Sequence, residues 1–406
     1  MTANPRYVLA VLFLVNLLNY IDRQVLYAVF PLLKPDLMLS DTQLGALASS
    51  FMIVYMCAAP FAGWYGDRSR RNRWLAGGVG IWSLATVFSG LSRTYGQLLA
   101  SRSLVGIGEA CYGSIAPSFI AERFKLDTRA RVLGFFSMAI PVGSALGYVL
   151  GGQLGERYGW RTAFYMVGVP GLLAAMLAGF LKDPRSDPAA SGSTPPGLPA
   201  YLTLLKNRVF MADTLAGAAM TFAVGGLAAW MPSYFVRSWG VSVGQAGLWF
   251  GGVTVAAGTL GSLSGGWLGD WVLKRTKKSY FLVTGLGFLA SIPFCAATLW
   301  APDCRTALVF LFCAEFLIFL NNGPINALLV DCTPVAIRSM AFAVNIFFIH
   351  ALGDALSPTL IGWVSDRTDL RTGLAMALCA LFVAAVFCLA GTRFMDDVPD
   401  ERPADA

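Results

Sequence analysis

The sequence has few charged residues and only one histidine. Asp, Glu, Lys and Arg make up 13% of its 406 residues, against roughly a quarter in an ordinary soluble domain, whereas 56% of the residues are hydrophobic. One histidine cannot build a zinc site, and the eight cysteines are scattered without a CxxC pair. We therefore expect no metal site and no cofactor, and we expect the cysteines to be small core residues.

Motifs that carry catalysis or nucleotide hydrolysis are also absent. The chain has no GxSxG serine, no HExxH helix and no GxxxxGK[ST] phosphate loop. These absences argue against an intramembrane enzyme and against a pump driven by ATP. We expect a protein that is not an enzyme.

Long apolar stretches recur along the whole chain. A helix needs about 20 apolar residues to cross a bilayer, and the pattern lacks the two-residue alternation of a membrane barrel. The sequence predicts an all-α membrane protein with twelve transmembrane helices. The predicted spans are 7–33, 42–66, 74–92, 95–121, 130–153, 162–181, 208–236, 243–268, 279–299, 307–330, 338–362 and 373–394.

The net charge of +7 follows the predicted topology. Most Lys and Arg residues fall in the termini and in loops such as 67–73, 122–131, 182–208 and 274–278, which lie on one side of the membrane if the spans alternate. Because basic residues stay on the cytoplasmic side, we expect both termini to be cytoplasmic. The excess of basic residues therefore reflects the orientation of the chain in the membrane and does not indicate a nucleic-acid partner. The short loops without an Asn-x-Ser/Thr site fit a multi-pass protein of the plasma or inner membrane.

One short pattern closes the second, fifth, eighth and eleventh predicted spans. A glycine pair permits close helix approach, and an acid at a membrane edge costs little, so each copy alone is a weak signal. Four copies at one per three helices indicate nested three-helix repeats, the inverted-repeat plan of secondary transporters. The copies are GWYGDR (63–68), GQLGER (152–157), GWLGDW (266–271) and GWVSDR (362–367).

The two halves meet at a segment rich in Pro, Ser, Gly and Ala, typical of a flexible linker. We therefore predict an N-terminal six-helix bundle over residues 1–182, a cytoplasmic linker over 183–205, a C-terminal six-helix bundle over 206–394 and a short cytoplasmic tail over 395–406.

The stretch Gly63-x-x-x-Asp67-Arg68-x-Arg70-Arg71 resembles the loop motif of the major facilitator superfamily. It departs from that motif where Arg70 replaces the second glycine and Asn72 replaces a basic residue. Within the superfamily the chain resembles the Spinster group of lipid transporters. That resemblance rests on NYIDR (19–23), SLVGIGEACY (103–112), AIPVGS (139–144) and LGDALSP (352–358).

The first and fourth predicted spans together contain four charged residues, each of which costs roughly 2.5 to 3.5 kcal/mol at a helix centre. Asp22 and Arg23 are adjacent in the first span, and Arg102 and Glu109 share a face of the fourth. The resemblance implies that these spans line a central cavity where the four residues converge. One interpretation is that these residues form structural ion pairs. The other is that they form a network in which Asp22 gains and loses a proton during transport, with Glu109 as its partner near the substrate. The sequence leaves both interpretations open.

The resemblance also implies a cytoplasmic gate. Asp67, beside Arg68 and Arg71, would meet the N-terminus of the eleventh span near Arg338, whose helix dipole favours an anion. Asp270, in the third copy of the pattern, would be a weaker equivalent. The alternative is a loop charge that serves only orientation.

Polar residues in the last third of the chain complete the predicted substrate cavity. Asn322 and Asn326 lie one turn apart, and His350 and Asp354 are spaced for an i,i+4 hydrogen bond. A charged N-terminal half opposite an aromatic C-terminal half would suit a substrate with a polar head and an acyl tail. The predicted cavity residues are Asn19, Tyr20, Tyr112, Phe319, Asn321, Asn322, Asn326, Asn345, His350 and Asp354.

The leading hypothesis is a monomeric secondary transporter working by alternating access. The resemblance implies an amphipathic lipid substrate, such as a lysophospholipid or sphingoid phosphate, with proton coupling through Asp22 and Glu109. The alternative is a proton-coupled transporter of a small organic anion or drug, held by Arg23 and Arg102.

Overall fold

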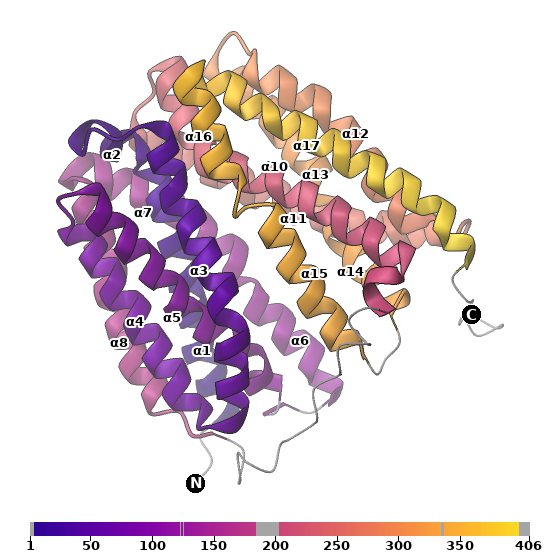
Figure 1. Ribbon diagram of the computed structural model, residues 1–406, viewed down its shortest axis with the longest axis horizontal. Coiled ribbons are helices and arrows are strands. Elements are labelled where there is room, and N and C mark those ends of the chain that lie inside the picture. The colour runs from indigo at the N-terminus through magenta and orange to yellow at the C-terminus, as the bar shows by residue number, and fades with distance from the viewer. Residues whose placement is uncertain (1–3, 122, 125, 184–202, 334–336, 398–406) are drawn as a thin grey trace. The chain divides into compact units, whose positions relative to one another are not determined.

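The computed structural model describes residues 4–121, 123–124, 126–183, 203–333 and 337–397, and within these residues it contains helices and no strands. Figure 1 labels the helices. They are α1 (Pro5–Ala28), α2 (Phe30–Asp36), α3 (Asp41–Arg68), α4 (Arg71–Leu91), α5 (Tyr95–Ala121), α6 (Leu126–Ser137), α7 (Ala139–Tyr158), α8 (Trp160–Gly179), α10 (Arg208–Trp239), α11 (Val243–Leu273), α12 (Ser279–Leu299), α13 (Cys304–Phe319), α14 (Asn322–Asp331), α15 (Arg338–Leu352), α16 (Ser357–Arg367), α17 (Leu370–Gly391) and the 3-10 helix η3 (Thr392–Asp397).

Eleven helical segments of the described chain are long and apolar enough to cross a membrane. Helix α5 is not among them, yet its 27 residues suffice to span a bilayer. With α5 as the twelfth, the spans correspond one by one to the predicted segments. The prediction of an all-α membrane protein is confirmed.

Four of the spans are broken into two helices, which the sequence analysis did not predict. The breaks lie at Val29 between α1 and α2, at Met138 between α6 and α7, at 320–321 between α13 and α14, and at 353–356 between α15 and α16. Broken helices are typical of transporters, where freed backbone groups line a site or permit bending.

Local capping explains where several helices begin. Asn4 accepts a hydrogen bond from the Arg6 amide, and Ser40 and Gln43 form a reciprocal capping box at the start of α3. Two turns require glycine, since Gly159 between α7 and α8 has φ +84° and Gly240 between α10 and α11 has φ +63°.

The chain divides into two compact units. Unit 1 comprises residues 1–193, 226–255 and 355–373, and unit 2 comprises residues 194–225, 256–354 and 374–406. Most of the predicted linker over 183–205 lies outside the described residues, as does the tail after 397. The described residues therefore do not test the predicted domain boundaries.

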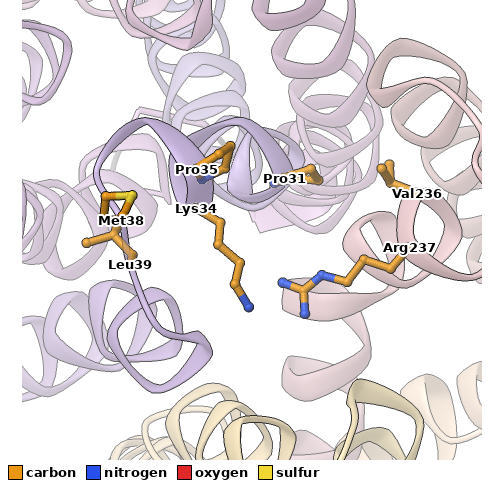
Figure 2. Close-up of a pocket in the computed structure, with 7 residues that line it drawn as sticks. All are labelled: Pro31, Lys34, Pro35, Met38, Leu39, Val236 and Arg237. Atoms are coloured by element: carbon orange, nitrogen blue, oxygen red, sulfur yellow. The ribbon is translucent and has the colours of Figure 1, made fainter.

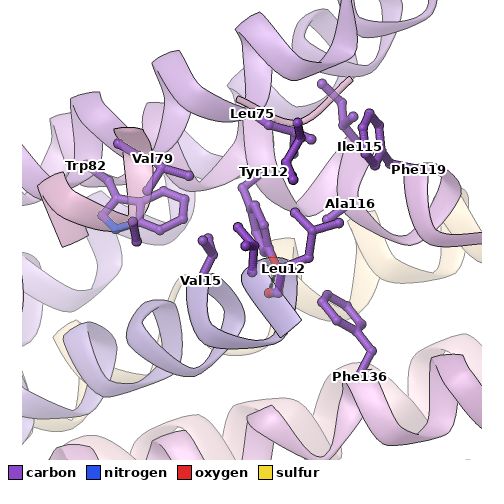
Figure 3. Close-up of a cluster of buried hydrophobic side chains, with 14 of the residues drawn as sticks. Leu12, Val15, Leu75, Val79, Trp82, Tyr112, Ile115, Ala116, Phe119 and Phe136 are labelled. Atoms are coloured by element: carbon purple, nitrogen blue, oxygen red, sulfur yellow. Dashed lines mark hydrogen bonds between the residues drawn. The ribbon is translucent and has the colours of Figure 1, made fainter. Parts of the chain in front are cut away.

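In unit 1 the helices pack as neighbouring pairs, α3 with α5, α4 with α5 and α8, and α1 with α7 (Figure 1). Figure 3 shows the core between them, where Leu12, Trp82, Tyr112 and Phe136 meet. Helices α4 and α5 approach closely at Gly108, where a Cβ atom would lie 2.6 Å from the backbone nitrogen of Trp82. This packing fixes the depth and rotation of α5, which carries two of the intramembrane charges.

The core of unit 2 is built on α12, which packs against α13 and α14. Phe281 and Phe288 of α12 are buried, as are Leu311 and Ile318 of α13. This core supports α14, which carries Asn322 and Asn326 of the predicted cavity.

Candidate functional site

Asp22 is fully enclosed by polar partners in the middle of α1. Arg102 of α5 donates from Nη1 to Asp22 Oδ1 at 3.1 Å, and the Thr86 hydroxyl of α4 donates to Asp22 Oδ2 at 2.7 Å. Asp22 and Arg102 are each 1% exposed, and Thr86 is not exposed at all. Both carboxylate oxygens are therefore satisfied, as a buried ion pair requires.

Glu109 pairs with the other arginine. The Arg23 Nε donates to Glu109 Oε2 at 2.7 Å, and the Glu109 side chain is inaccessible, whereas 17% of the Arg23 side chain is exposed. The second oxygen, Glu109 Oε1, is buried and has no hydrogen-bond partner. Glu109 thus has a half-satisfied carboxylate, in contrast to Asp22.

Three aromatic rings surround the Arg23 guanidinium. Its central carbon lies 5.2 Å from the Tyr20 ring centre, 4.9 Å from Phe51 and 5.3 Å from Tyr55. Cation–π contacts of this kind hold a guanidinium in place and surround it with apolar surface. The arrangement provides a partly exposed cation bordered by rings.

The structure brings together the four predicted charged residues and pairs them crosswise between α1 and α5. The sequence analysis did not single out Thr86, Phe51 or Tyr55. Thr86 carries only a weak signal, because the same predicted span also contains Ser83, Ser89 and Ser92. The two aromatic residues carry none, since aromatic residues are common throughout the spans.

Among the other α1 and α5 predictions, Asn19 is 4% exposed and its Nδ2 has no hydrogen-bond partner. Tyr20 lies beside Arg23. Tyr112 lies in the unit 1 core, 2% exposed, and its hydroxyl donates to the Leu12 carbonyl at 2.6 Å (Figure 3). Because Tyr112 is packed in this core and its hydroxyl is hydrogen-bonded to Leu12, we do not assign it to the substrate cavity.

The predicted polar residues of unit 2 fall into two groups. Asn322 and Asn326 are exposed on α14, where Asn322 donates to Ser262 Oγ at 2.8 Å and Asn326 donates to the Asn322 carbonyl at 2.7 Å. Asn321 is buried at the break before α14 and donates to the Ile318 carbonyl, with Phe319 half-buried beside it.

The second group lies on and after α15. Asn345 is buried and donates to Thr214 Oγ1 of α10 at 3.0 Å, so it connects two helices of unit 2. His350 Nδ1 lies 2.9 Å from Asp354 Oδ1, which confirms the geometric expectation for this pair. Asp354 stands in the break between α15 and α16, outside both helices.

The side chains of the predicted cytoplasmic gate are only partly described. Those of Asp67, Arg68 and Arg338 lie outside the described residues. The amide of Arg71 donates to Asp183 Oδ2 at 2.9 Å, which caps the start of α4, and Asp270 lies 3.4 Å from the Tyr280 hydroxyl. The gate therefore stays a prediction.

A second cluster of charges lies in unit 1, at the end opposite the N-terminus, and the sequence analysis missed it. We call it the distal cluster, and its centre is Asp41 at the start of α3. Arg237 of α10 donates to both oxygens of Asp41 at 2.7 and 2.8 Å, and Lys34 and Ser365 each donate at 2.6 Å. Asp41 is 2% exposed. The carboxylate thus binds α10, α16 and the end of α2 to α3.

Two copies of the repeated sequence pattern dock at this same end of unit 1. Asp366 of the fourth copy accepts hydrogen bonds from the Asp41 and Thr42 amides, both at 2.8 Å, at the start of α3. Glu156 of the second copy accepts from the Gly244 amide at 2.6 Å, at the start of α11. In both cases an acid satisfies free amides at a helix N-terminus. The recurrence of the pattern was the signal that could have predicted these contacts.

A cavity of about 510 Å³ borders the distal cluster. Figure 2 shows Lys34 and Arg237 reaching toward one another across it. The remaining lining residues are apolar: Pro31, Pro35, Met38, Leu39 and Val236. This cavity lies apart from the Asp22–Glu109 network.

Comparison with known proteins agrees with the fold. The Major Facilitator Superfamily model matches residues 12–358. "Protein spinster homolog 1" of Xenopus laevis is 35% identical over 382 residues, which cover 89% of this chain and 73% of that protein. "Sphingosine-1-phosphate transporter SPNS2" of Xenopus tropicalis is 32% identical over 409 residues, covering 93% of this chain and 80% of that protein.

Solved structures show the same fold. A bacterial homologue of the human lysosomal transporter Spinster, in an inward-facing and unoccupied conformation, superposes with a TM-score of 0.89 at 24% identity and covers 99% of this chain and 100% of that one. A D-xylose–proton symporter superposes with a TM-score of 0.74 at 19% identity, over 94% of this chain and 96% of that one. The chain therefore belongs to the Spinster group of the major facilitator superfamily, and it is a multi-pass membrane transporter and not an enzyme.

Proposed function

We propose that the protein moves a single-chain amphipathic lipid with an anionic headgroup, of the lysophospholipid or sphingoid-phosphate class, by proton-coupled alternating access. The relative from Xenopus tropicalis carries sphingosine-1-phosphate in its name, which supports this substrate class. The proposal places the protein in the plasma or inner membrane as a monomer, with both termini in the cytoplasm.

One observation carries the proposal, namely the surroundings of Arg23. Its side chain is the one partly exposed member of the four-residue network, and Tyr20, Phe51 and Tyr55 border it. A guanidinium forms strong charge-assisted hydrogen bonds with a phosphate, and aromatic rings accept the first methylenes of an acyl chain. An anionic amphiphile needs both of these groups at one place.

Proton coupling follows from the competition for Arg23. In the structure Arg23 donates to Glu109. A proton on Glu109 removes the negative charge that holds Arg23, so Arg23 becomes available to the lipid headgroup. A headgroup bound to Arg23 in turn favours the neutral form of Glu109. The anion and the proton therefore bind together and travel in the same direction.

This proposal moves the proton from Asp22, as first hypothesised, to Glu109. Asp22 has a partner on each oxygen, Arg102 and Thr86. Glu109 has one partner and one unsatisfied oxygen. We assign Asp22 and Arg102 to holding α1 and α5 in register.

Alternating access requires two gates that open in turn. We propose that the distal cluster and the contacts of Asp366 and Glu156 form the outer gate, which is closed in the state described. Asp67 and Asp270 lie in the first and third copies of the repeated pattern, so we assign them to the cytoplasmic gate.

The test is transport in proteoliposomes under a pH gradient and without one. A lysophospholipid with an anionic headgroup, its zwitterionic counterpart and a small aromatic carboxylate are compared as substrates. We expect the anionic lysolipid to be transported fastest, and faster with the gradient. Arg23→Gln should lower its transport roughly 10-fold or more, the worth of one charged hydrogen bond. Arg93→Gln, which alters an exposed arginine away from the network, is the control.

Preferred transport of the small carboxylate would contradict the lipid assignment and favour a transporter of organic anions. Equal rates with and without the gradient would contradict proton coupling.

A further inference from the structure

Unit 2 contains a buried carboxylate that the proposed mechanism does not use. Asp213 lies near the start of α10, in an apolar stretch, and it is 1% exposed. Neither of its oxygens has a hydrogen-bond partner. Asp22 and Glu109, the buried acids of the network, each have an arginine partner, so Asp213 differs from both.

Among the described residues, the side chains on which the charge of Asp213 acts include two thiols, Cys332 at the end of α14 and Cys388 of α17. No described cation forms an ion pair with Asp213. The Arg208 guanidinium, one turn before Asp213, lies 5.7 Å from the Phe394 ring centre. Asp331, which also acts on Cys332, is itself an acid.

The hydrogen-bonding groups beside Asp213 are already engaged with other partners. The Thr214 hydroxyl accepts from Asn345 at 3.0 Å, and the Asn207 amide donates to the Cys332 carbonyl at 2.9 Å. Neither side chain donates to Asp213, whose two oxygens lack a hydrogen-bond partner among the described residues.

An ionised carboxylate in such a place has no compensation for its lost hydration, which costs several kcal/mol even after relaxation. A bound proton removes that cost. We propose that Asp213 is a proton-binding site of unit 2, loaded in the state described and discharged in another state of the transport cycle. It is separate from Glu109, which lies in unit 1.

A purely structural role fits the observations poorly. A neutral carboxyl at this position still has a hydroxyl without an acceptor, so an apolar residue of similar size would be more stable. An ionisable side chain kept within a membrane helix at such a cost is a functional candidate on physical grounds. Release of the proton from Asp213 during the transport cycle depends on the proposed proton-coupled transport. Binding of the proton in the state described does not depend on it.

Infrared spectroscopy of the purified full-length protein in lipid tests the loading directly. A protonated carboxylic acid has a carbonyl stretch that an ionised one lacks. At neutral pH we expect a band of this kind that disappears in Asp213→Asn, because asparagine keeps the shape and has no acid proton. Asp303→Asn, at an exposed helix cap before α13, is the matched control and should leave the band unchanged. Glu109→Gln separates any contribution of the network.

A spectrum that is identical in Asp213→Asn and in the wild type would overturn the proposal, because Asp213 would then be ionised. The discharge step is tested by transport at two pH values. Asp213→Asn should move the ratio of the two rates toward one, and an unchanged ratio would show that the proton stays bound throughout the cycle. Since the band needs no substrate, it distinguishes failure of this proposal from failure of the proposed function.

Discussion

At the scale of single residues, the crossed pairing gives the two acids of the network different tasks. Asp22 is held by Arg102 and Thr86 on its two oxygens, whereas Glu109 is held by Arg23 on one. A carboxylate with both oxygens satisfied anchors two helices. A carboxylate with a spare oxygen, paired with a partly exposed arginine, can change partners. We therefore propose that the structural interpretation applies to Asp22 and Arg102 and the functional one to Arg23 and Glu109.

The anchoring role predicts a stability effect. Arg102→Gln leaves the Asp22 charge buried without its cation, which should cost about 3–5 kcal/mol. Thr86→Val removes one hydrogen bond to the charged carboxylate, which should cost about 1.5–3 kcal/mol. Thermal unfolding in detergent measures both. The double variant Asp22→Asn/Arg102→Gln should recover part of the loss, because no unpaired charge remains.

Arg305→Gln, which alters an exposed arginine on α13, serves as the reference for a surface arginine. If Arg102→Gln were no more destabilising than Arg305→Gln, the Asp22–Arg102 pair would not anchor the helices.

The sequence could predict that these residues meet but not how they pair. Spacing places Arg102 and Glu109 on one face of α5, and the family resemblance brings α1 and α5 together. Which acid meets which arginine depends on the rotation of each helix, and that rotation is set by close contacts such as Gly108 against Trp82. Asp213 was missed because a single acid near the expected membrane edge has no distinguishing pattern.

At the scale of helices, the repeated pattern acts as a docking device. In its second and fourth copies an acid caps the N-terminus of another helix, Glu156 at α11 and Asp366 at α3. The glycine of each copy allows the approach, since a Cβ atom at Gly152 would lie 2.8 Å from the Val243 carbonyl oxygen.

Hydrogen exchange should reveal the cap at α3. Asp366→Ala removes the acceptor of the Asp41 and Thr42 amides, and loss of a cap costs about 0.5–2 kcal/mol, so exchange at these two amides should rise roughly 2- to 30-fold. Mass spectrometry of peptides that begin several residues before Asp41, and therefore retain both amides, measures this change.

Asp369→Ala is the matched control, because Asp369 caps α17 by accepting from the Thr372 amide at 2.9 Å. Its effect should stay within the first turn of α17. Equal exchange at the start of α3 in both variants would mean that Asp366 does not hold the outer gate closed.

Alanine substitutions at Gly108 of α5 and Gly77 of α4 should have opposite effects on stability. Gly108→Ala forces a Cβ atom against the α4 backbone and should destabilise the protein by about 1–3 kcal/mol. Gly77→Ala meets nothing within 4 Å and should be neutral or stabilising by about 0.5–1 kcal/mol, because alanine favours the helix. Thermal unfolding of the two variants decides the matter, and equal melting temperatures would contradict the close α4–α5 packing.

The number and position of the spans could be predicted from hydropathy alone, but the breaks within them could not. Pro31, Pro35 and Pro358 stand near two breaks, yet proline also occurs inside unbroken helices such as α5 and α8. The distal cluster was equally out of reach, because Arg237 and Asp366 lie 196 and 325 residues from Asp41.

At the scale of the whole molecule, the proposed cycle connects one charge exchange with two gates. Protonation of Glu109 releases Arg23 for the headgroup, and the loss of the Arg23–Glu109 bond loosens a contact between α1 and α5. The gates formed by the repeated pattern then open in turn. The central claim is that Arg23 binds either Glu109 or an anionic lipid.

The most direct measurement is the affinity of the purified protein for an anionic lysophospholipid as a function of pH. In the wild type, affinity should rise as the pH falls, because protonation of Glu109 frees Arg23. In Glu109→Gln, affinity should be high and independent of pH, and in Arg23→Gln it should be low at every pH. Unchanged pH dependence in Glu109→Gln, or undiminished binding in Arg23→Gln, would contradict the account.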